Sequence, residues 1–346
     1  MALSDLPVAV DCMGGDLGIS VQVEGAIAAL NKYQIKTILV GPEVQLREKI
    51  IELGGKVSDF LIHHADQIIT MEDSPVRAVR KKPNSSLCKA FELVRDDVAG
   101  SVISSGNSGA MMAAGRFICG LIPGIERPAI SAMMPKPGNL PGTIMLDAGA
   151  NVDCTADHLV QFAIMGSVYC AYIQGIKNPR VALLSNGSEP TKGTDVVRAA
   201  AATLGNLKEI NYIGYAEGRD IPTDFADVVV CDGFVGNLVL KSMEGAVKMV
   251  FDELRFEADQ DIFSKMTLWL SKGIFKRMFE RKFSYKYHAC APLLGLSKLG
   301  LVCHGSSDAV AVENAIFRAS DLQKKDMIQG ITRSLHQHED LILKIS

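Results

Sequence analysis

Residues 101–116 read Ser-Val-Ile-Ser-Ser-Gly-Asn-Ser-Gly-Ala-Met-Met-Ala-Ala-Gly-Arg, and this stretch indicates the kind of fold. A short run centred on valine and isoleucine is typical of a strand that is covered on both faces. The glycines that follow permit a tight turn, and the small residues after them suit a helix packed on a sheet. The stretch therefore predicts a strand–loop–helix unit, from which parallel α/β sheets are built.

The same alternation extends along nearly the whole chain. Helical patterns separate most of the further strands, which we expect at residues 8–11, 37–40, 60–63, 143–147, 180–184, 211–214, 228–231 and 301–304. Repeated βαβ units of this kind predict an α/β protein with a largely parallel sheet. The alternation breaks at residues 251–291, which we expect to be a helical insertion in a single domain spanning residues 1–346.

The composition excludes several classes of protein. Hydrophobic residues make up 48% of the 346 residues, so a large core is available. The 36 basic and 39 acidic residues give a net charge of -3, which is not the footprint of a general nucleic-acid-binding protein. We expect no secretory signal, and eight cysteines without a C-x-x-C pair predict reduced thiols in the cytoplasm. Residues 159–176 are uncharged, but their glutamines and glycines favour a buried helix over a membrane span.

Glycine-containing loops follow several of the expected strands, where ligands bind in open α/β sheets. Backbone amides and lysine side chains in such loops suit an oxyanion or a phosphate. Simpler roles stay open, because Ser108 can act only as a helix cap and Lys192 can be a solvated loop lysine. The loops are residues 11–16, 104–109, 185–195, 231–237 and 303–308.

Several common kinds of site are not predicted. Residues 192–194 read Lys-Gly-Thr, which is the wrong order for a Walker A loop, and no G-x-G-x-x-G follows the first strand. The chain also lacks an H-E-x-x-H zinc motif. His304 lies close in sequence to Ser306 and Asp308, but adjacency in sequence is not the geometry of a catalytic triad. We therefore expect neither a metal nor a cofactor.

Ten segments together resemble the bacterial acyl-(acyl carrier protein):phosphate acyltransferase family of phospholipid synthesis. Each segment alone is modest, but their order and spacing are specific, and they cover nearly the whole chain. They are VAVDCMGGDLG (8–18), MEDSPVRAVRKKPNSSL (71–87), ISSGNSGAMMAAGR (103–116), RPAI (127–130), MLDAGANVDC (145–154), LLSNGSEPTKGTDVVRAA (183–200), EGRDI (217–221), DVVVCDGFVGNLVLKSMEG (227–245), APLLGL (291–296) and HGSSDA (304–309). This chain departs from the family pattern in two places. It has Ala289-Cys290 where the family pattern looks like Gly-Gly, and it has Ser188-Glu189-Pro190 where relatives often look more acidic.

The resemblance implies a three-layer α/β/α sandwich with a mostly parallel sheet, similar to phosphate acetyltransferases and isocitrate dehydrogenase-like enzymes. It also implies the transfer of a long-chain fatty acyl group from acyl-acyl carrier protein to inorganic phosphate. The acyl phosphate would supply phosphatidic acid and phospholipid synthesis through a membrane-bound glycerol-3-phosphate acyltransferase. The resemblance also implies a homodimer. From the cysteine pattern and from residues 259–282, described below, we expect a cytoplasmic enzyme that associates reversibly with the inner face of the cell membrane.

Direct attack by phosphate demands positioning and charge stabilisation more than a strong base, since its dianion is already nucleophilic near neutral pH and a thiolate leaves readily. We assign Lys192 to neutralise phosphate or the oxyanion, and His304 to donate a hydrogen bond to the oxyanion or the leaving sulfur. Asp232 and Asn237 would orient Lys192 or the thioester. The expected phosphate-binding residues are Gly106, Asn107, Ser108, Gly109 and Ser306, and the expected supporting loop holds Asp11, Gly14, Gly15 and Asp16.

Residues 259–282 form an amphipathic pattern at helical spacing, with six basic and three acidic side chains. An apolar face beside basic residues suits an anionic membrane surface or an acidic carrier protein. Packing on the chain's own domain or on a dimer mate stays open. We expect membrane contact at Phe263, Leu270 and Ile274, on the face formed by Ile262, Phe263, Met266, Leu270, Ile274 and Met278.

Two other functions remain to be distinguished from the implied one. A short-chain phosphotransacetylase would use acyl-coenzyme A as its donor. A peripheral membrane or scaffold protein would have no catalytic activity, although the loops rich in Gly, Asn and Lys speak against this class.

Overall fold

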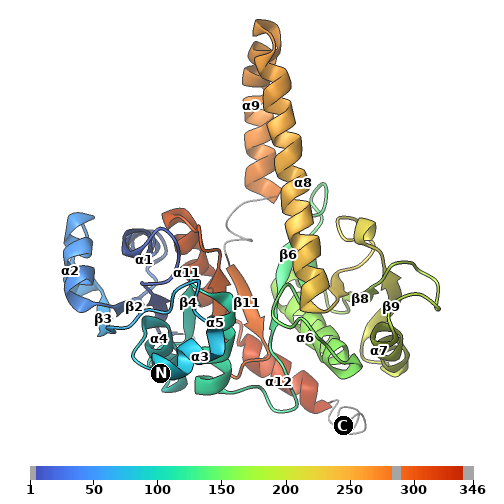
Figure 1. The fold of residues 1–346 in the computed structure, drawn as a ribbon, viewed down its shortest axis with the longest axis horizontal. Helices are drawn as coiled ribbons and strands as arrows, with labels where there is room; N and C mark the ends of the chain where they lie inside the picture. The colour runs from blue at the N-terminus through green and yellow to red at the C-terminus, as the bar shows by residue number, and fades with distance from the viewer. Residues whose placement is uncertain (1–4, 283–289, 338–346) are drawn as a thin grey trace.

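A computed structural model of the chain describes residues 5–282 and 290–337. Figure 1 shows two α/β lobes side by side and a helical hairpin that projects away from both of them. The lobes are built on separate sheets, of seven and five strands. The expected parallel strands are therefore present but are divided between two sheets.

The first lobe has a seven-stranded sheet in the order β3-β2-β1-β4-β12-β11-β5. The run from β3 to β12 is parallel, whereas β11 and then β5 each pair antiparallel with the strand before them. The strands are β1 (Val8–Asp11), β2 (Thr37–Gly41), β3 (Leu61–His64), β4 (Ser101–Ser104), β5 (Ala129–Ile130), β11 (Cys290–Leu294) and β12 (Leu299–Cys303). Its helices are α1 (Ile19–Tyr33), α2 (Glu43–Glu52), α3 (Pro75–Lys81), α4 (Ser86–Arg95), α5 (Ser108–Ala114) and α11 (Ala309–Lys324), with short turns η2 (Val57–Asp59) and η3 (Gly115–Cys119).

The second lobe has a five-stranded sheet in the order β6-β7-β10-β8-β9, in which only β6 is antiparallel to its neighbour. The strands are β6 (Ala132–Met134), β7 (Thr143–Leu146), β8 (Arg180–Leu184), β9 (Asn211–Ala216) and β10 (Val228–Val230). The helices here are α6 (Ala156–Gln174), α7 (Asp195–Asn206) and α12 (Met327–Gln337), with the short turn η4 (Gly218–Asp220).

Both faces of each sheet are covered, because alternate strand residues belong to opposite cores. In β1, Val8 and Val10 pack with α1 and α11, while Ala9 packs with α4 and α5. In β7, Ile144 packs with α6, and Met145 packs with the start of the hairpin's first helix. The expected α/β class with three layers and mostly parallel strands is therefore confirmed.

The projecting hairpin consists of α8 (Gly233–Asp259) and α9 (Ile262–Lys282). The two helices pack through apolar side chains, including Phe251 and Phe275, whose rings lie edge to face with centroids 6.3 Å apart. Helix α8 starts well before the expected insertion at residues 251–291, and strand β11 starts inside that range. The helical region is thus longer at its beginning and shorter at its end than the sequence pattern indicates.

Residues 159–176 were expected to form a buried helix, and this is confirmed by α6. Its side chains are buried along most of the helix, between the sheet of the second lobe and helices α7 and α12. Within residues 5–282 and 290–337, no helix has both the length and the apolar character needed to cross a bilayer. All eight cysteines are free thiols.

Candidate active site

Three of the expected loops meet at one edge of the first sheet. Strands β1, β4 and β12 are parallel neighbours, so the loops that follow them leave from the same edge. The amide of Asp16 donates to the carbonyl of Gly305 at 2.8 Å, which joins the first loop to the last. A Cβ on Gly14 would lie 2.8 Å from the amide nitrogen of Gly106, so this close approach requires glycine.

Asp11 anchors this group of loops from inside the protein. Its carboxylate accepts hydrogen bonds from the Ser104 hydroxyl at 2.7 Å and from the Met13 amide at 3.3 Å. Burial raises the pKa of Asp11 above its usual value, although bonds from Ser86 and Ser104 oppose the shift. The Ser104 hydroxyl also accepts from the Gly106 amide at 3.1 Å. Asp11 therefore holds the ends of two loops together from a position where it is shielded from solvent, and its role in supporting a functional loop stays a prediction.

Asn107, and not Ser108, is the N-cap of α5. Its side-chain oxygen accepts from the Ala110 amide at 3.1 Å, so the alternative in which Ser108 caps the helix is wrong. The side-chain nitrogen of Asn107 donates to the carbonyls of Met71 and Asp73, each at 3.2 Å. Since the first-turn amides of a helix lack intrahelical acceptors, those of Ser108 and Gly109 are the donors that this loop offers to an anion.

His304 and Ser306 are in contact, as the candidate site requires. The Ser306 amide donates to Nδ1 of His304 at 3.2 Å, and the Ser306 hydroxyl lies 2.7 Å from the same nitrogen. Because Nδ1 accepts a hydrogen bond, a neutral His304 carries its proton on Nε2. Both side chains are exposed, so Nε2–H is the donor that this ring offers to a ligand.

In the second lobe, the loop after β7 wraps around the buried carboxylate of Asp147. This carboxylate accepts hydrogen bonds from the amides of Ile130, Ala150 and Asn151, and from the Asn151 side chain at 2.8 Å. Burial raises the pKa of Asp147, and these bonds oppose that shift. No role for Asp147 or Asn151 is predicted from the sequence pattern, although an acidic residue at the end of an apolar strand, before Gly149, is a signal that was available.

The start of α8 packs directly on this loop. Asp232 is the N-cap and accepts from the Val235 amide at 2.9 Å. The Gly233 amide donates to the Asn151 carbonyl at 2.7 Å. Asn237 lies against Gly149, with its Cβ 3.4 Å from the position that a Cβ on Gly149 would take. Asp232 and Asn237 therefore lie beside the loop at residues 147–151.

Lys192 lies in the loop between β8 and α7, at the same edge of the second sheet as the loops that follow β7 and β10. Its stem folds over Gly187, where an added Cβ would be 2.9 Å from Cγ of Lys192. The ammonium group makes no ion pair within residues 5–282 and 290–337, and in that part of the chain no hydrogen bond joins Lys192 to Asp232 or Asn237. Its expected role in charge neutralisation stays a prediction.

A cavity of about 280 Å³ lies between the two lobes and joins their loops. Ser108 and Gly109 line it from the first lobe, and Gly149 and Asn151 line it from the second. The remaining wall is mostly apolar and is formed by Val76, Met112, Ala113, Arg116, Phe117, Pro128, Ile130 and Ala150. This wall is not predictable from the sequence pattern, because its members come from separate segments.

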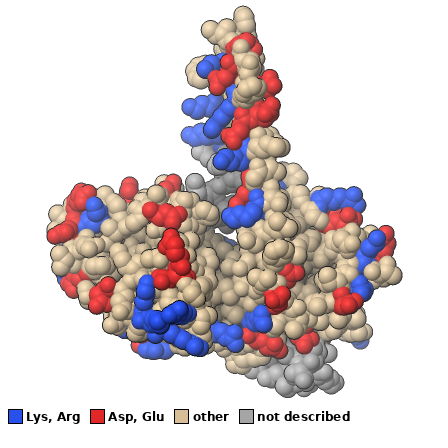
Figure 2. Space-filling model, viewed as in Figure 1, with Lys and Arg blue, Asp and Glu red and all other residues tan. Residues whose placement is uncertain are grey.

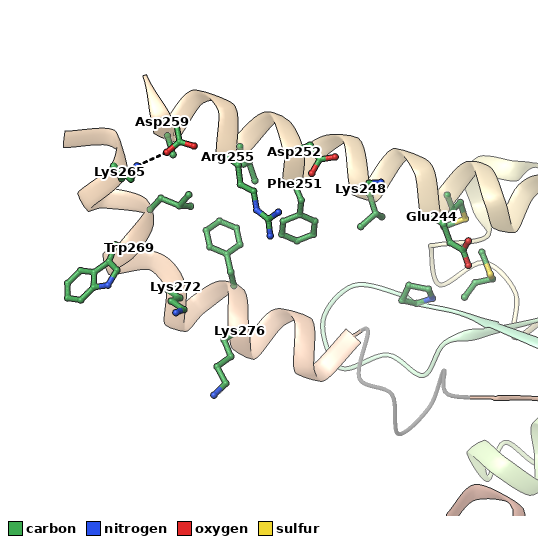
Figure 3. Close-up of a pocket in the computed structure, with 18 of the residues that line it drawn as sticks. Glu244, Lys248, Phe251, Asp252, Arg255, Asp259, Lys265, Trp269, Lys272 and Lys276 are labelled. Atoms are coloured by element: carbon green, nitrogen blue, oxygen red, sulfur yellow. Dashed lines mark ion pairs between the residues drawn. The ribbon is translucent and has the colours of Figure 1, made fainter. Parts of the chain in front are cut away.

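A larger groove, of about 1180 Å³, lies between the two helices of the hairpin. In Figure 3, Phe251 points from α8 towards α9, whereas Lys276 points away from α8. At the tip, Lys265 and Asp259 form an ion pair at 2.9 Å. None of the expected catalytic residues lines this groove, and none of them lines the cavity between the lobes either. Ser108 and Gly109, from the expected phosphate-binding loop, line the cavity and not the groove, so the cavity between the lobes is the candidate active site.

Comparison with known proteins gives the family. The family model described as "Fatty acid synthesis protein" matches residues 6–330. A curated protein from Trichlorobacter lovleyi, "Phosphate acyltransferase", is 48% identical over 332 residues, covering 96% of this chain and 95% of that protein. The chain belongs to the phosphate acyltransferase family. It is therefore an acyltransferase.

Solved structures confirm the expected fold of this family member. A phosphotransacetylase from Streptococcus pyogenes aligns with a TM-score of 0.60 at 16% identity, covering 96% of each chain. A 4-hydroxythreonine-4-phosphate dehydrogenase from Klebsiella pneumoniae aligns with a TM-score of 0.51 at 12% identity, covering 92% of this chain and 99% of that chain. At these identities the similarity shows the fold alone.

The two departures from the family pattern fall in different places. Cys290 is the first residue of β11 and lies opposite Cys303 of β12, while Ala289 lies outside the described residues. Ser188, Glu189 and Pro190 are exposed in the loop that carries Lys192. Of the described residues in these departures, Cys290 and Ser188–Pro190, none lines the cavity between the lobes.

Proposed function

We propose that the enzyme transfers a long-chain fatty acyl group from acyl-acyl carrier protein to inorganic phosphate. The observation that carries this proposal is the cavity between the lobes, where the first-turn residues Ser108 and Gly109 meet an apolar wall. Such amides suit a phosphate dianion, and the apolar wall suits an acyl thioester. The name of the relative from Trichlorobacter lovleyi gives phosphate as that protein's acceptor, which supports the same acceptor here.

The proposed reaction needs no covalent enzyme intermediate. A phosphate oxygen attacks the carbonyl carbon of the thioester, and the carbonyl oxygen becomes an oxyanion. When the oxyanion collapses, the carbon–sulfur bond breaks and the leaving sulfur takes up the proton that the phosphate dianion carried, so the products are acyl phosphate and the carrier protein thiol. Lys192 would neutralise the negative charge, and Nε2–H of His304 would donate to the oxyanion or to the leaving sulfur.

Thiol release from palmitoyl-acyl carrier protein, measured with and without inorganic phosphate, tests this function. We expect phosphate-dependent release, with palmitoyl phosphate identified as the product by mass spectrometry. Release from acetyl-coenzyme A, but not from the carrier protein, would indicate a short-chain phosphotransacetylase instead. No thiol release from either donor would contradict an acyl transfer of this kind.

The product explains the proposed place of the enzyme in the cell. Acyl phosphate has an apolar tail, and exposing that tail to water costs about 0.8 kcal/mol per CH₂ group. We therefore infer that a cytoplasmic enzyme releases it beside the inner face of the cell membrane, for a membrane-bound glycerol-3-phosphate acyltransferase. Phospholipid synthesis would then use the phosphatidic acid that follows.

The projecting hairpin supports such a membrane contact. On α9, Phe263, Leu270 and Ile274 are 74%, 68% and 61% exposed, since the helix packs on α8 through its opposite side. Exposed apolar side chains beside basic residues suit an anionic membrane surface. We also propose a homodimer, because α8 leaves Met249 and Phe256 exposed along the same hairpin, and sedimentation equilibrium would test this.

A further inference from the structure

Exposed cations gather on α3, at the lower left of the molecule in Figure 2. Arg77, Arg80 and Lys81 are exposed, and none of them makes an ion pair within the described residues. Lys82 differs, because it pairs with Asp73 at 2.5 Å. Arg116, which lies in η3 and is also exposed, makes no ion pair in that part of the chain either. Four exposed cations without an ion pair, so close to a candidate active site, favour the binding of an anionic partner.

The cations are held on a fixed surface. Ala78 and Val79 of α3 are buried in the core that also contains α4 and α5. The segment that leads into α3 is fixed by Asn107, whose side-chain nitrogen donates to the carbonyls of Met71 and Asp73. The same side chain caps α5, so one residue ties the basic surface to the candidate phosphate loop.

Apolar side chains lie among these cations. Met71, Val76 and Phe117 are 49%, 47% and 48% exposed, and the guanidinium of Arg80 lies 5.2 Å from the ring centroid of Phe117. An apolar centre with a charged rim is the usual composition of a protein-binding surface. The positive charges of this surface favour an acidic partner and speed the association of that partner with the enzyme.

This surface opens into the active-site cavity. Val76, Arg116 and Phe117 belong both to the surface and to the cavity wall, which continues to Ser108 and Gly109. A partner seated on α3 is therefore adjacent to the cavity mouth. A flexible arm that carries a thioester can enter there and reach the loop that we assign to phosphate.

We propose that α3 and η3 form the docking surface for the acidic face of the acyl carrier protein, and that its acyl-bearing arm enters the cavity past Phe117. This inference rests on the proposed function, because it assumes a carrier-protein donor. Coenzyme A is also anionic and is long enough to span this seven-residue helix of about 10 Å, so the comparison of donors below distinguishes it, whereas exposed apolar side chains among the cations are typical of a protein-binding surface. The charge pattern, spread over an exposed helix, favours the protein.

Charge reversal on α3 tests the docking surface at three residues that do not themselves line the cavity. We expect R77E/R80E/K81E to raise the KM for palmitoyl-acyl carrier protein ~10–100-fold and to weaken its salt dependence, with kcat changed less than about twofold. The KM for inorganic phosphate and the turnover of a small palmitoyl-pantetheine donor should stay at wild-type values. The matched control K36E/K56E/K208E reverses three exposed lysines elsewhere and should keep the wild-type KM for every donor.

Binding of holo-acyl carrier protein, measured by titration calorimetry, separates this inference from the proposed function. Weaker binding to R77E/R80E/K81E, with unchanged circular dichroism, supports the docking surface. Equal KM and equal binding for the variant and the wild type would overturn it, even if the wild type forms palmitoyl phosphate. An increase in KM confined to palmitoyl-coenzyme A would also overturn it, and so would an equal loss of turnover with the pantetheine donor. Absence of phosphate-dependent release in the wild type would instead contradict the proposed function.

Discussion

At the scale of single residues, Lys192 is the side chain on which the proposed chemistry depends most. Its ammonium group has no acidic partner among the described residues, and its stem is fixed over Gly187. We expect Lys192→Ala to lower kcat at saturating phosphate ~100–1,000-fold, the effect of removing one stabilising group from an oxyanion site. Lys192→Arg should recover part of the loss, because it restores the charge but not the geometry.

The control for this prediction is Lys177→Ala, which removes an exposed lysine that makes no ion pair in the described part of the chain. It should keep full turnover. Near-full turnover of Lys192→Ala at saturating phosphate would show that our assignment of Lys192 is wrong.

Gly236 lies where the structure has no space for a side chain. A Cβ there would lie 1.9 Å from the carbonyl oxygen of Asp147, so the backbone of the loop would have to move. We expect Gly236→Ala to lower the free energy of unfolding by ~1–3 kcal/mol, as overpacking does, and to lower activity through the loop at residues 147–151. Urea unfolding measures the first effect.

Gly245 of the same helix provides the matched comparison. A Cβ there would meet no atom within 4 Å. Because alanine favours helices over glycine, Gly245→Ala should raise stability by ~0.5–1 kcal/mol. Equal effects of the two substitutions would mean that helix propensity, and not the contact with Asp147, governs this region.

At the scale of secondary-structure elements, an ion pair joins β8 to the segment before β10. Burial of the Asp227 carboxylate acts to raise its pKa, but hydrogen bonds from the Arg180 side chain and amide outweigh burial, and the net pKa is lowered. A lowered pKa stabilises the folded state above the unfolded value of about 3.9, and this contribution is lost as pH falls through the folded pKa. We expect Asp227→Asn to cost ~1.5–3 kcal/mol at pH 7.

The measurement is the free energy of unfolding as a function of pH. The wild-type and Asp227→Asn curves should approach each other as pH falls below the unfolded value of about 3.9, and should converge below the lowered folded pKa, where the wild-type carboxyl is protonated as well. A constant difference between the curves down to the lowest pH would contradict an ionic contribution from Asp227.

The strands show which elements sequence can predict. Continuous apolar runs such as those of β1 and β10 are confirmed, because strands covered on both faces need no alternation. Strands β5 and β6 were missed because they have only two and three residues. Strand β11 was missed because Pro292 and the preceding helical pattern obscure it. The division into two sheets was also missed, since strand order depends on contacts between distant segments.

The candidate site shows the same limit. Loops after β1, β4 and β12 could be expected to meet, because glycines mark the ends of strands that proved to be neighbours. The role of Asp147 could not be expected, since it depends on amides from both Ile130 and Asn151 folding around one carboxylate. The proximity of the basic helix α3 to the cavity also arises only when distant segments pack together.

At the scale of the whole molecule, the site exists only because two lobes meet. Ser108 comes from the first lobe and Gly149 from the second, and both line one cavity. The relative position of the lobes therefore sets the distance between the candidate phosphate loop and the opposite wall. The hairpin projects away from both lobes in Figure 1, so the proposed membrane contact and the cavity between the lobes lie in separate parts of the molecule.

This separation predicts that attachment can be removed without removing catalysis. Replacing Phe263, Leu270 and Ile274 by serine should weaken binding to anionic liposomes ~100-fold or more, since each buried side chain contributes at least about 1.5 kcal/mol. Turnover of palmitoyl-acyl carrier protein in solution should stay unchanged, because these residues do not line the cavity between the lobes. Serine at the exposed Val44, Ile51 and Val98 is the matched control and should leave liposome flotation unchanged. The folded hairpin variant could instead keep its flotation and shift from dimer to monomer in sedimentation. That result would mean that Phe263, Leu270 and Ile274 contact the second subunit and not lipid.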